Sequence, residues 1–186
     1  MSGQLAAADR ATLLKVARDA IAHGLQHGRA PAVDPQYYSP ALREHGAAFV
    51  TLEIGDDLRG CIGTLEARRP LVVDVAQNAF AAAFRDTRFP PLTAREAPLL
   101  SLHISVLSAP VPLPVRDAAD LLAKLRPGVD GLVISEGARR ATFLPSVWEQ
   151  LPEPREFLAH LLRKGGWPAG YWSPQMRVER YGSETF

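Results

Sequence analysis

The chain has a single cysteine, Cys61, and the residues around it form the pattern most suggestive of chemistry. Arg59 stands two residues earlier, so on a β-strand the two side chains would share one face, about 7 Å apart. A nearby positive charge lowers the pKa of a thiol and favours the reactive thiolate. A free cysteine is also, in many proteins, a small buried hydrophobe without chemistry. The sequence leaves both interpretations of Cys61 open, an inert residue and a nucleophile or redox centre.

Two glycines, Gly60 and Gly63, flank this cysteine. Glycine inside a strand marks either an irregularity or close packing against another element. It also lets a ligand or the backbone of a partner come close, because no side chain stands in the way. Both glycines are therefore candidates for a binding surface as well as for tight packing.

Three polar residues further along the chain are also candidates for binding. Asp86 and Arg88 lie in a loop that Pro90 and Pro91 keep out of the preceding helix. They could present a charged pair at the rim of a site, or form an ion pair that satisfies the helix end. His103 projects from the polar face of a predicted strand, where it could act in catalysis or simply form hydrogen bonds in water.

Metal and cofactor sites are not predicted. His23 and His27 have the i, i+4 spacing of a helical metal pair, but no glutamate-containing zinc motif surrounds them. Two histidines and one cysteine that is distant in sequence do not provide the four ligands of a structural zinc site. We therefore expect neither a bound metal nor a cofactor.

Composition narrows the class of protein. Lys and Arg total 21 and Asp and Glu total 20, and this balance argues against nucleic acid and acidic membranes as partners. No apolar run approaches the ~20 residues that span a bilayer. The first nine residues lack the pattern of a signal peptide, and a single cysteine forms no internal disulfide. These features predict a cytoplasmic protein.

Periodicity places the candidates on elements. Asp9 is expected to cap the first helix, and Pro70 to open the second. Because hairpins and helices alternate without a βαβ rhythm, we predict an α+β fold around a mainly antiparallel sheet. Alternation puts Arg59 and Cys61 on one strand face, with the Asp86–Arg88 loop expected beside them. The predicted helices are 10–27, 70–84, 117–126 and 154–164, and the predicted strands are 48–54, 58–66, 99–107, 131–135, 139–144 and 175–182.

Several segments in order resemble the AmmeMemoRadiSam system protein A family, also called the AMMECR domain family. The most specific is the LRGCIG sequence around Cys61, and the likeness extends from about Gly46 to the last residue. His103 departs from the family pattern, which commonly has an acidic residue there. The matching segments are Gly46–Leu52, Leu58–Gly63, Asp86–Pro91 with Glu96, Ile104–Ser108, Leu144–Gln150, Glu156–Leu158 and Tyr171–Trp172.

The resemblance implies one domain over residues 1–186, with two lobes and a cleft near the RGCIG strand. Family members are often encoded with, or fused to, a Memo-like protein and a radical S-adenosylmethionine enzyme. The leading hypothesis is a binding or accessory protein that works with these partners. The alternative is an enzyme that acts on a small molecule through Cys61. We expect Arg59→Glu to spare the fold and abolish partner binding, unless Arg59 pairs internally with Glu53 or Asp86.

Overall fold

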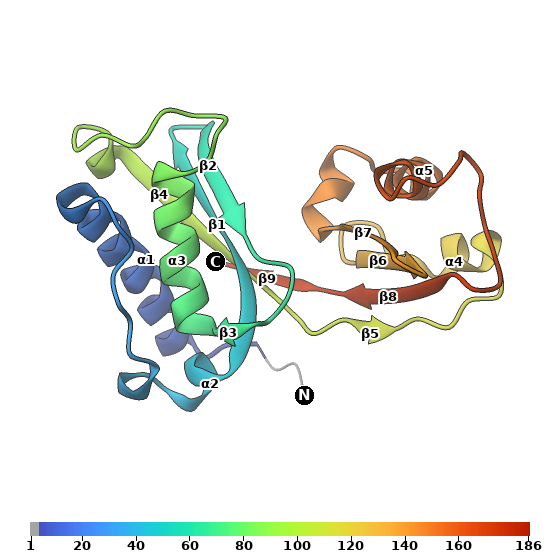
Figure 1. The fold of residues 1–186 in the computed structure, drawn as a ribbon, viewed down its shortest axis with the longest axis horizontal. Helices are drawn as coiled ribbons and strands as arrows, with labels where there is room; N and C mark the ends of the chain where they lie inside the picture. The colour runs from blue at the N-terminus through green and yellow to red at the C-terminus, as the bar shows by residue number, and fades with distance from the viewer. Residues whose placement is uncertain (1–3) are drawn as a thin grey trace. The chain divides into compact units, whose positions relative to one another are not determined.

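The computed structural model describes residues 4–186 and divides into two compact units, which are described separately below (Figure 1). Unit 1 extends to Leu107 and includes the chain end, Glu184–Phe186, while unit 2 comprises Ser108–Ser183. Helices are combined with two sheets of antiparallel strands. The predicted α+β class is therefore confirmed. Residues 1–3, part of the stretch expected to lack a signal peptide, lie outside the described residues.

Unit 1 is a sheet with helices against it. Its strands run in the order β2-β1-β4-β9, and β3 pairs with the start of β1. In Figure 1, α1 and α3 lie side by side, and β9 brings the C terminus to the sheet. The elements are α1 (Ala7–His27), η1 (Pro35–Tyr37), α2 (Pro40–Arg43), β1 (His45–Ile54), β2 (Asp57–Gly63), β3 (Arg69–Pro70), α3 (Leu71–Phe84), η2 (Ala97–Leu99), β4 (Leu100–Leu107) and β9 (Ser183–Thr185).

The hydrophobic core of unit 1 lies between this sheet and the helices α1 and α3. Val50 and Leu52 of β1 and Ile104 of β4 are fully buried in it, together with the apolar stripe of α3. Side chains alternate along a strand, so the residues between these point away from the helices. This second face of the sheet carries the polar residues described in the next section.

The first helix begins three residues before the predicted start at residue 10, and Ala6 rather than Asp9 is its N-cap. Asp9 instead accepts a hydrogen bond of 2.6 Å from the hydroxyl of Ser39, which ties α1 to the loop before α2. A tertiary partner has replaced the predicted local cap.

The β1–β2 hairpin turns at Gly55, whose φ of 62° is a left-handed conformation that glycine adopts without strain. Its register shifts between Leu52 and Glu53, which pair with Gly60 and Leu58. Arg59 is thus the extra residue of a β-bulge. Because of this extra residue, alternation does not predict whether the Arg59 and Cys61 side chains share a face of the strand.

A buried carboxylate anchors the exit of this hairpin. Asp74, 1% exposed, accepts hydrogen bonds from the Ala48 backbone (2.9 Å), the Thr64 hydroxyl (2.6 Å) and the Asn78 amide (3.0 Å). It also pairs with Arg69 at 2.7 Å. β2 ends at Gly63 rather than at residue 66, and the Thr64 N–H still donates to the Ala48 carbonyl of β1 at 3.1 Å while its side chain binds this carboxylate.

Unit 2 has a second sheet, with strand order β5-β8-β6-β7. Its core contains Leu132, Ile134 and Phe157, and Trp148 stacks on Phe157 with ring centroids 3.8 Å apart. The elements are β5 (Val111–Pro112), α4 (Ala118–Lys124), β6 (Gly131–Glu136), β7 (Arg139–Phe143), η3 (Pro145–Glu149), α5 (Pro154–Lys164) and β8 (Arg177–Tyr181).

The last predicted strand, 175–182, corresponds to β8 (Arg177–Tyr181), and a further strand, β9 (Ser183–Thr185), follows it in the other sheet. β8 belongs to unit 2, and after Gly182 the chain continues as β9 in the sheet of unit 1. The backbone of Phe186 exchanges hydrogen bonds with Ile104, with N–O distances of 2.9 and 3.1 Å. Local sequence does not show this change of sheet, since the strand pattern simply continues.

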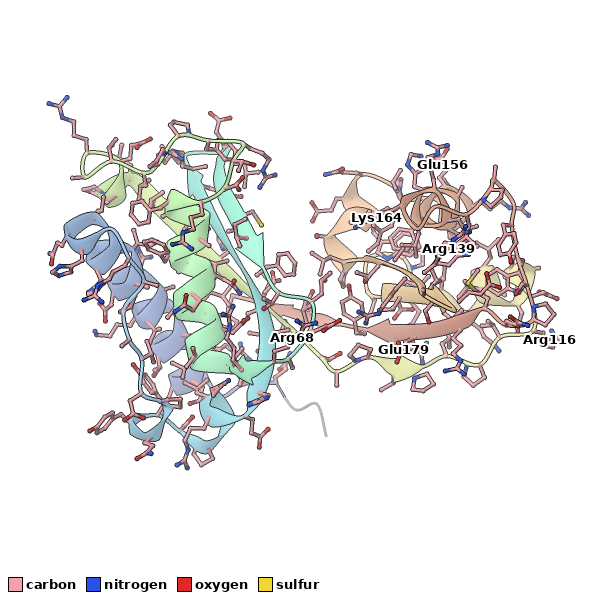
Figure 2. The ribbon with its side chains drawn as sticks, in the orientation of Figure 1. Arg68, Arg116, Arg139, Glu156, Lys164 and Glu179 are labelled. Carbon is pink, nitrogen blue, oxygen red and sulfur yellow. The ribbon has the colours of Figure 1, made fainter. Side chains whose placement is uncertain are left out.

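Charged side chains of both signs are spread over the molecule. In unit 2, Arg116 stands beside α4 and Arg139 on β7, well apart from each other (Figure 2). Among residues 4–186, no helix combines the length and hydropathy that crossing a bilayer requires.

Candidate functional site

A row of three polar side chains crosses the face of the unit 1 sheet that α1 and α3 leave uncovered. Thr51 of β1 pairs in register with Cys61 of β2 on one side and with His103 of β4 on the other. We call these three residues the Cys61 row. The Thr51 Oγ1 and Cys61 Sγ atoms are 3.3 Å apart, within hydrogen-bonding reach. The thiol is therefore held in a fixed place beside a hydroxyl group.

The local hydrogen-bond pattern explains this proximity. The backbone N–H and C=O of Cys61 point away from β1, to Asp86 and Arg88. Cys61 and Thr51 therefore form a pair without mutual backbone hydrogen bonds, the kind in which side chains on neighbouring strands come closest. Strand geometry brings the thiol to Thr51, and no loop is needed to place it.

His103 ends the row next to an acidic side chain. Its Nε2 lies 3.6 Å from the Glu53 carboxylate, and the His103 side chain is 50% exposed. Further along the same face, the Ser105 and Thr185 hydroxyls are 2.8 Å apart. The face thus offers a thiol, hydroxyls, an imidazole and a carboxylate in neighbouring positions, and it can form hydrogen bonds with a polar ligand or partner.

Asp86 and Arg88 hold the outer edge of β2 at Cys61. The Cys61 N–H donates to the Asp86 carboxylate at 2.9 Å, and Arg88 donates to the Cys61 carbonyl at 3.3 Å. The two side chains also pair with each other at 2.7 Å. They take the place of a neighbouring strand and satisfy an edge that would otherwise be open. The hydrogen bond from Arg88 holds the pKa of Asp86 far below its usual range.

The predicted position of the Asp86–Arg88 loop beside Cys61 is therefore found in the structure. Both side chains act on the Cys61 backbone, which is the structural alternative considered for this pair. Whether they also contact a ligand stays a prediction.

Arg59 departs from its prediction, because its guanidinium is engaged inside unit 1. It binds the Glu96 carboxylate through Nε at 2.9 Å and the Pro90 carbonyl through Nη2 at 2.9 Å. Its side chain is only 11% exposed. The same guanidinium, with hydrogen bonds from Thr93, lowers the pKa of Glu96 to about 2. The internal partner is Glu96, and neither Glu53 nor Asp86 fills that role.

Both glycines of the motif also serve packing. A Cβ on Gly60 would lie 2.1 Å from the Ala82 carbonyl oxygen of α3, and one on Gly63 would lie 2.2 Å from the Phe49 ring. The space beside each glycine is thus already filled by the protein itself. A side chain therefore has no room at either position, and the approach of a ligand to these glycines stays a prediction.

The His23 and His27 rings lie close together, with centroids 4.3 Å apart. Within residues 4–186, no three His, Cys, Asp or Glu side chains gather closely enough to hold a metal ion.

Sequence reasoning missed two residues of this region. Thr51 lies in the matching segment Gly46–Leu52, but its contact with Cys61 depends on a register that alternation alone does not give. Glu96 was noted only as part of a matching segment, and 37 residues separate it from Arg59. The signal available for both was their membership of segments that match the same family.

Comparison with known proteins agrees with these motifs. A family model described as AMMECR1 matches residues 14–186. The chain belongs to the AMMECR1 family. A protein of Methanothermobacter thermautotrophicus is 36% identical over 177 residues, which cover 94% of this chain and 92% of that protein. One from Thermofilum pendens is 35% identical over 196 residues, covering 99% and 92%.

A solved structure shows the same architecture. The crystal structure of an uncharacterised protein from Pyrococcus horikoshii matches this AMMECR1-family chain with a TM-score of 0.80 and 31% sequence identity. The match covers 94% of this chain and 88% of that one. Since the AMMECR1 match begins at residue 14, it includes every strand that carries the Cys61 row.

Proposed function

We propose that this AMMECR1-family protein is a binding and accessory protein that uses the Cys61 row to hold a small polar molecule. The observation that supports this is the row itself, a set of hydrogen-bonding side chains on a sheet face that helices α1 and α3 do not cover. His103 is half exposed and its 3.6 Å separation from Glu53 leaves its ring nitrogens able to bind a ligand.

The backbone that carries Cys61 is also held in place by neighbouring side chains, which favours ligand binding with little conformational reorganisation. The Asp86–Arg88 pair fixes the backbone of Cys61, and the Arg59–Glu96 pair fixes the bulge beside it. Groups held in place before a ligand arrives lose less conformational entropy on binding. A Memo-like protein and a radical S-adenosylmethionine enzyme, the partners implied by the family resemblance, would then receive or supply the bound molecule.

Co-purification tests this proposal. We expect the native protein to retain a Memo-like or radical S-adenosylmethionine partner, together with a small molecule that mass spectrometry identifies. The double variant Thr51→Val, His103→Gln should lose the small molecule and keep its melting temperature. The matched control Thr12→Val changes an exposed hydroxyl on α1 and should change nothing. Unchanged retention of the small molecule by the double variant would exclude the row as its site.

A second function, an enzyme with Cys61 as nucleophile or redox residue, is favoured by the Sγ–Oγ1 contact and by His103 in the same row. The two functions differ in what they require of the thiol. Binding tolerates Cys61→Ser, whereas catalysis needs the thiolate. Thiol labelling separates them: an enzyme predicts that Cys61 reacts with iodoacetamide faster than free cysteine at neutral pH, and more slowly in His103→Gln.

A further inference from the structure

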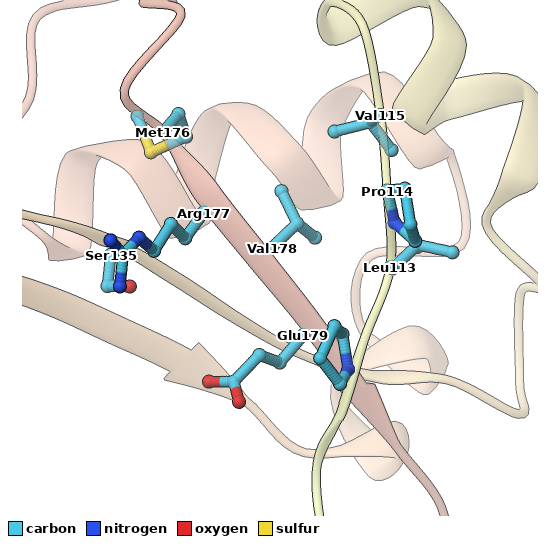
Figure 3. Close-up of a pocket in the computed structure, with 9 residues that line it drawn as sticks. Leu113, Pro114, Val115, Ser135, Met176, Arg177, Val178 and Glu179 are labelled. Atoms are coloured by element: carbon cyan, nitrogen blue, oxygen red, sulfur yellow. The ribbon is translucent and has the colours of Figure 1, made fainter.

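A cavity of about 420 Å³ lies within unit 2, where the chain after β5 parts from β8 (Figure 3). Its apolar residues Met176 and Val178 belong to the hydrophobic core of unit 2. Side chains alternate along β8, so Arg177 and Glu179 leave the strand on the opposite face, as Figure 3 shows for Val178 and Glu179. Charged and apolar groups thus line different sides of this cavity and do not form one slot for a ligand.

In unit 1, two imidazole rings meet on the last turn of α1. His23 and His27 are four residues apart, and their ring centroids are separated by 4.3 Å. His27 is exposed and His23 is partly exposed, so solvent reaches the pair. Histidines at this spacing lie on one face of a helix, where both rings can bind the same metal ion.

The distance between the two rings indicates which coordination geometry they fit. A metal ion about 2.0–2.1 Å from a ring nitrogen lies about 3.2 Å from the centre of that ring. Two rings at right angles around the ion then have centres about 4.5 Å apart, and two rings at the tetrahedral angle have centres about 5.2 Å apart. The observed 4.3 Å is close to the right-angle value. Right angles between neighbouring ligands are typical of tetragonal Cu²⁺ and Ni²⁺, whereas protein-bound zinc is tetrahedral.

The position of the pair at a helix end also favours a cation. α1 ends at His27, and the carbonyl groups of a last helical turn carry partial negative charge. The positive charge of Arg29 opposes a bound ion, but this residue is exposed, so water and salt screen the repulsion. In the part of the chain from residue 4 to residue 186, no third His, Cys, Asp or Glu side chain joins the pair. Water must therefore fill the remaining coordination positions, which makes the site open and its ion exchangeable.

We propose that His23 and His27 form an exchangeable surface site for a tetragonal divalent metal ion, Cu²⁺ or Ni²⁺. Each imidazole donates one ring nitrogen to the ion, and water supplies the other ligands. The four protein ligands that a structural zinc site requires are not needed here, because the ion does not hold the fold together. The site lies on a helix that covers the opposite face of the unit 1 sheet from the Cys61 row, and it does not depend on the function proposed for that row.

The test uses the full chain without a histidine tag, labelled with ¹⁵N, and Ni²⁺ as the probe. Ni²⁺ is paramagnetic and broadens the signals of nearby amides, and it does not oxidise the Cys61 thiol as Cu²⁺ does. We expect the amide signals of residues 22–28 to broaden first as Ni²⁺ is added. Calorimetric titration should show that Zn²⁺ binds at this pair more weakly than Ni²⁺, because the rings stand closer together than a tetrahedral ion requires.

Variants show whether both rings bind the ion. His23→Gln and His27→Gln should each weaken Ni²⁺ binding at least ~10-fold, because one ring alone loses the advantage of a second ligand held nearby. His160→Gln, which removes an exposed histidine of α5, is the matched control and should bind Ni²⁺ as the wild type does. Unchanged affinity in either α1 variant, or tighter binding of Zn²⁺ than of Ni²⁺, would overturn the proposal. Broadening centred on other residues of the wild type, or no broadening, would also overturn it, and that readout needs no variant to fold.

Discussion

Replacing Gly60 by alanine is the sharpest test of how β2 is held against α3. In the structure, an added Cβ would stand 2.1 Å from the Ala82 carbonyl oxygen, where real Cβ atoms essentially never come closer than 3.0 Å. The two elements would have to separate by about 0.9 Å, the difference between these distances. The obstructing atom belongs to the helix backbone, so no side chain can rotate away to relieve the contact.

The expected cost follows from this rigidity. Overpacking a close-packed core costs typically 1–3 kcal/mol, and a backbone obstruction places Gly60→Ala near the top, at about 3 kcal/mol. For a chain of this size, each kcal/mol lowers the melting temperature by about 2–4 °C, so the variant should melt about 6–12 °C below the wild type.

All three tryptophans lie in unit 2, whereas Cys61 lies in unit 1. Thiol labelling during heating therefore reports on unit 1, and tryptophan fluorescence reports on unit 2.

Two further glycines give the controls. Gly182→Ala meets only the Ser108 hydroxyl at 4.0 Å, an ordinary contact, and should melt within ~2 °C of the wild type. Gly63→Ala meets the movable Phe49 ring, so its smaller loss should be partly recovered by adding Phe49→Leu. If Gly60→Ala kept the wild-type melting temperature but lost a bound ligand, the glycine would serve ligand approach, and the packing argument would be refuted.

Three more outcomes are expected from the same region. Asp86→Asn should lower the melting temperature at neutral pH. Because the folded-state pKa of Asp86 is depressed, its contribution to stability is present above the unfolded pKa of about 3.9 and is lost as pH falls below that value. The difference in melting temperature between variant and wild type should therefore close in acid. Arg59→Glu should reduce melting temperature through repulsion with Glu96, and the exchange Arg59→Glu, Glu96→Arg should recover part of it; equal melting of all three proteins would contradict the pair. Cys61→Ser should cost less than about 1 kcal/mol, since the Thr51 hydroxyl can pair with the new one, and an unfolded variant in a melting curve would show otherwise.

Much of the fold could be predicted because local pattern and tertiary structure agree. Helix α5 occupies the predicted residues 154–164, where an apolar stripe begins at a proline and ends before two glycines. Helix α3 likewise starts after Pro70 and ends at Phe84. In these elements, the residues that start and stop the helix lie next to the stripe that it buries, so one short window contains all the information.

Prediction failed where a distant partner decided the outcome. The bulge at Arg59 follows from a pairing between two strands, and the Glu96 carboxylate that binds it comes from a loop beyond α3. Likewise, nothing near Gly182 shows that the chain leaves one sheet for another. Alternation of side chains shows which residues share a strand face, but it gives neither the register between strands nor the loop that covers an edge.

These contacts distinguish the residues of the RGCIG segment that hold β2 in place from the one that could take part in chemistry. Its arginine binds Glu96, its glycines admit α3 and Phe49, and its backbone at Cys61 is satisfied by Asp86 and Arg88. Each of these groups contacts another part of unit 1, so each acts by fixing β2. The Cys61 thiol is the exception, because it points to Thr51 on the open face. A substitution in one of these supporting groups should therefore change stability first. A substitution in the Cys61 row should change binding or reactivity first. Measuring both quantities on each variant distinguishes these two kinds of residue.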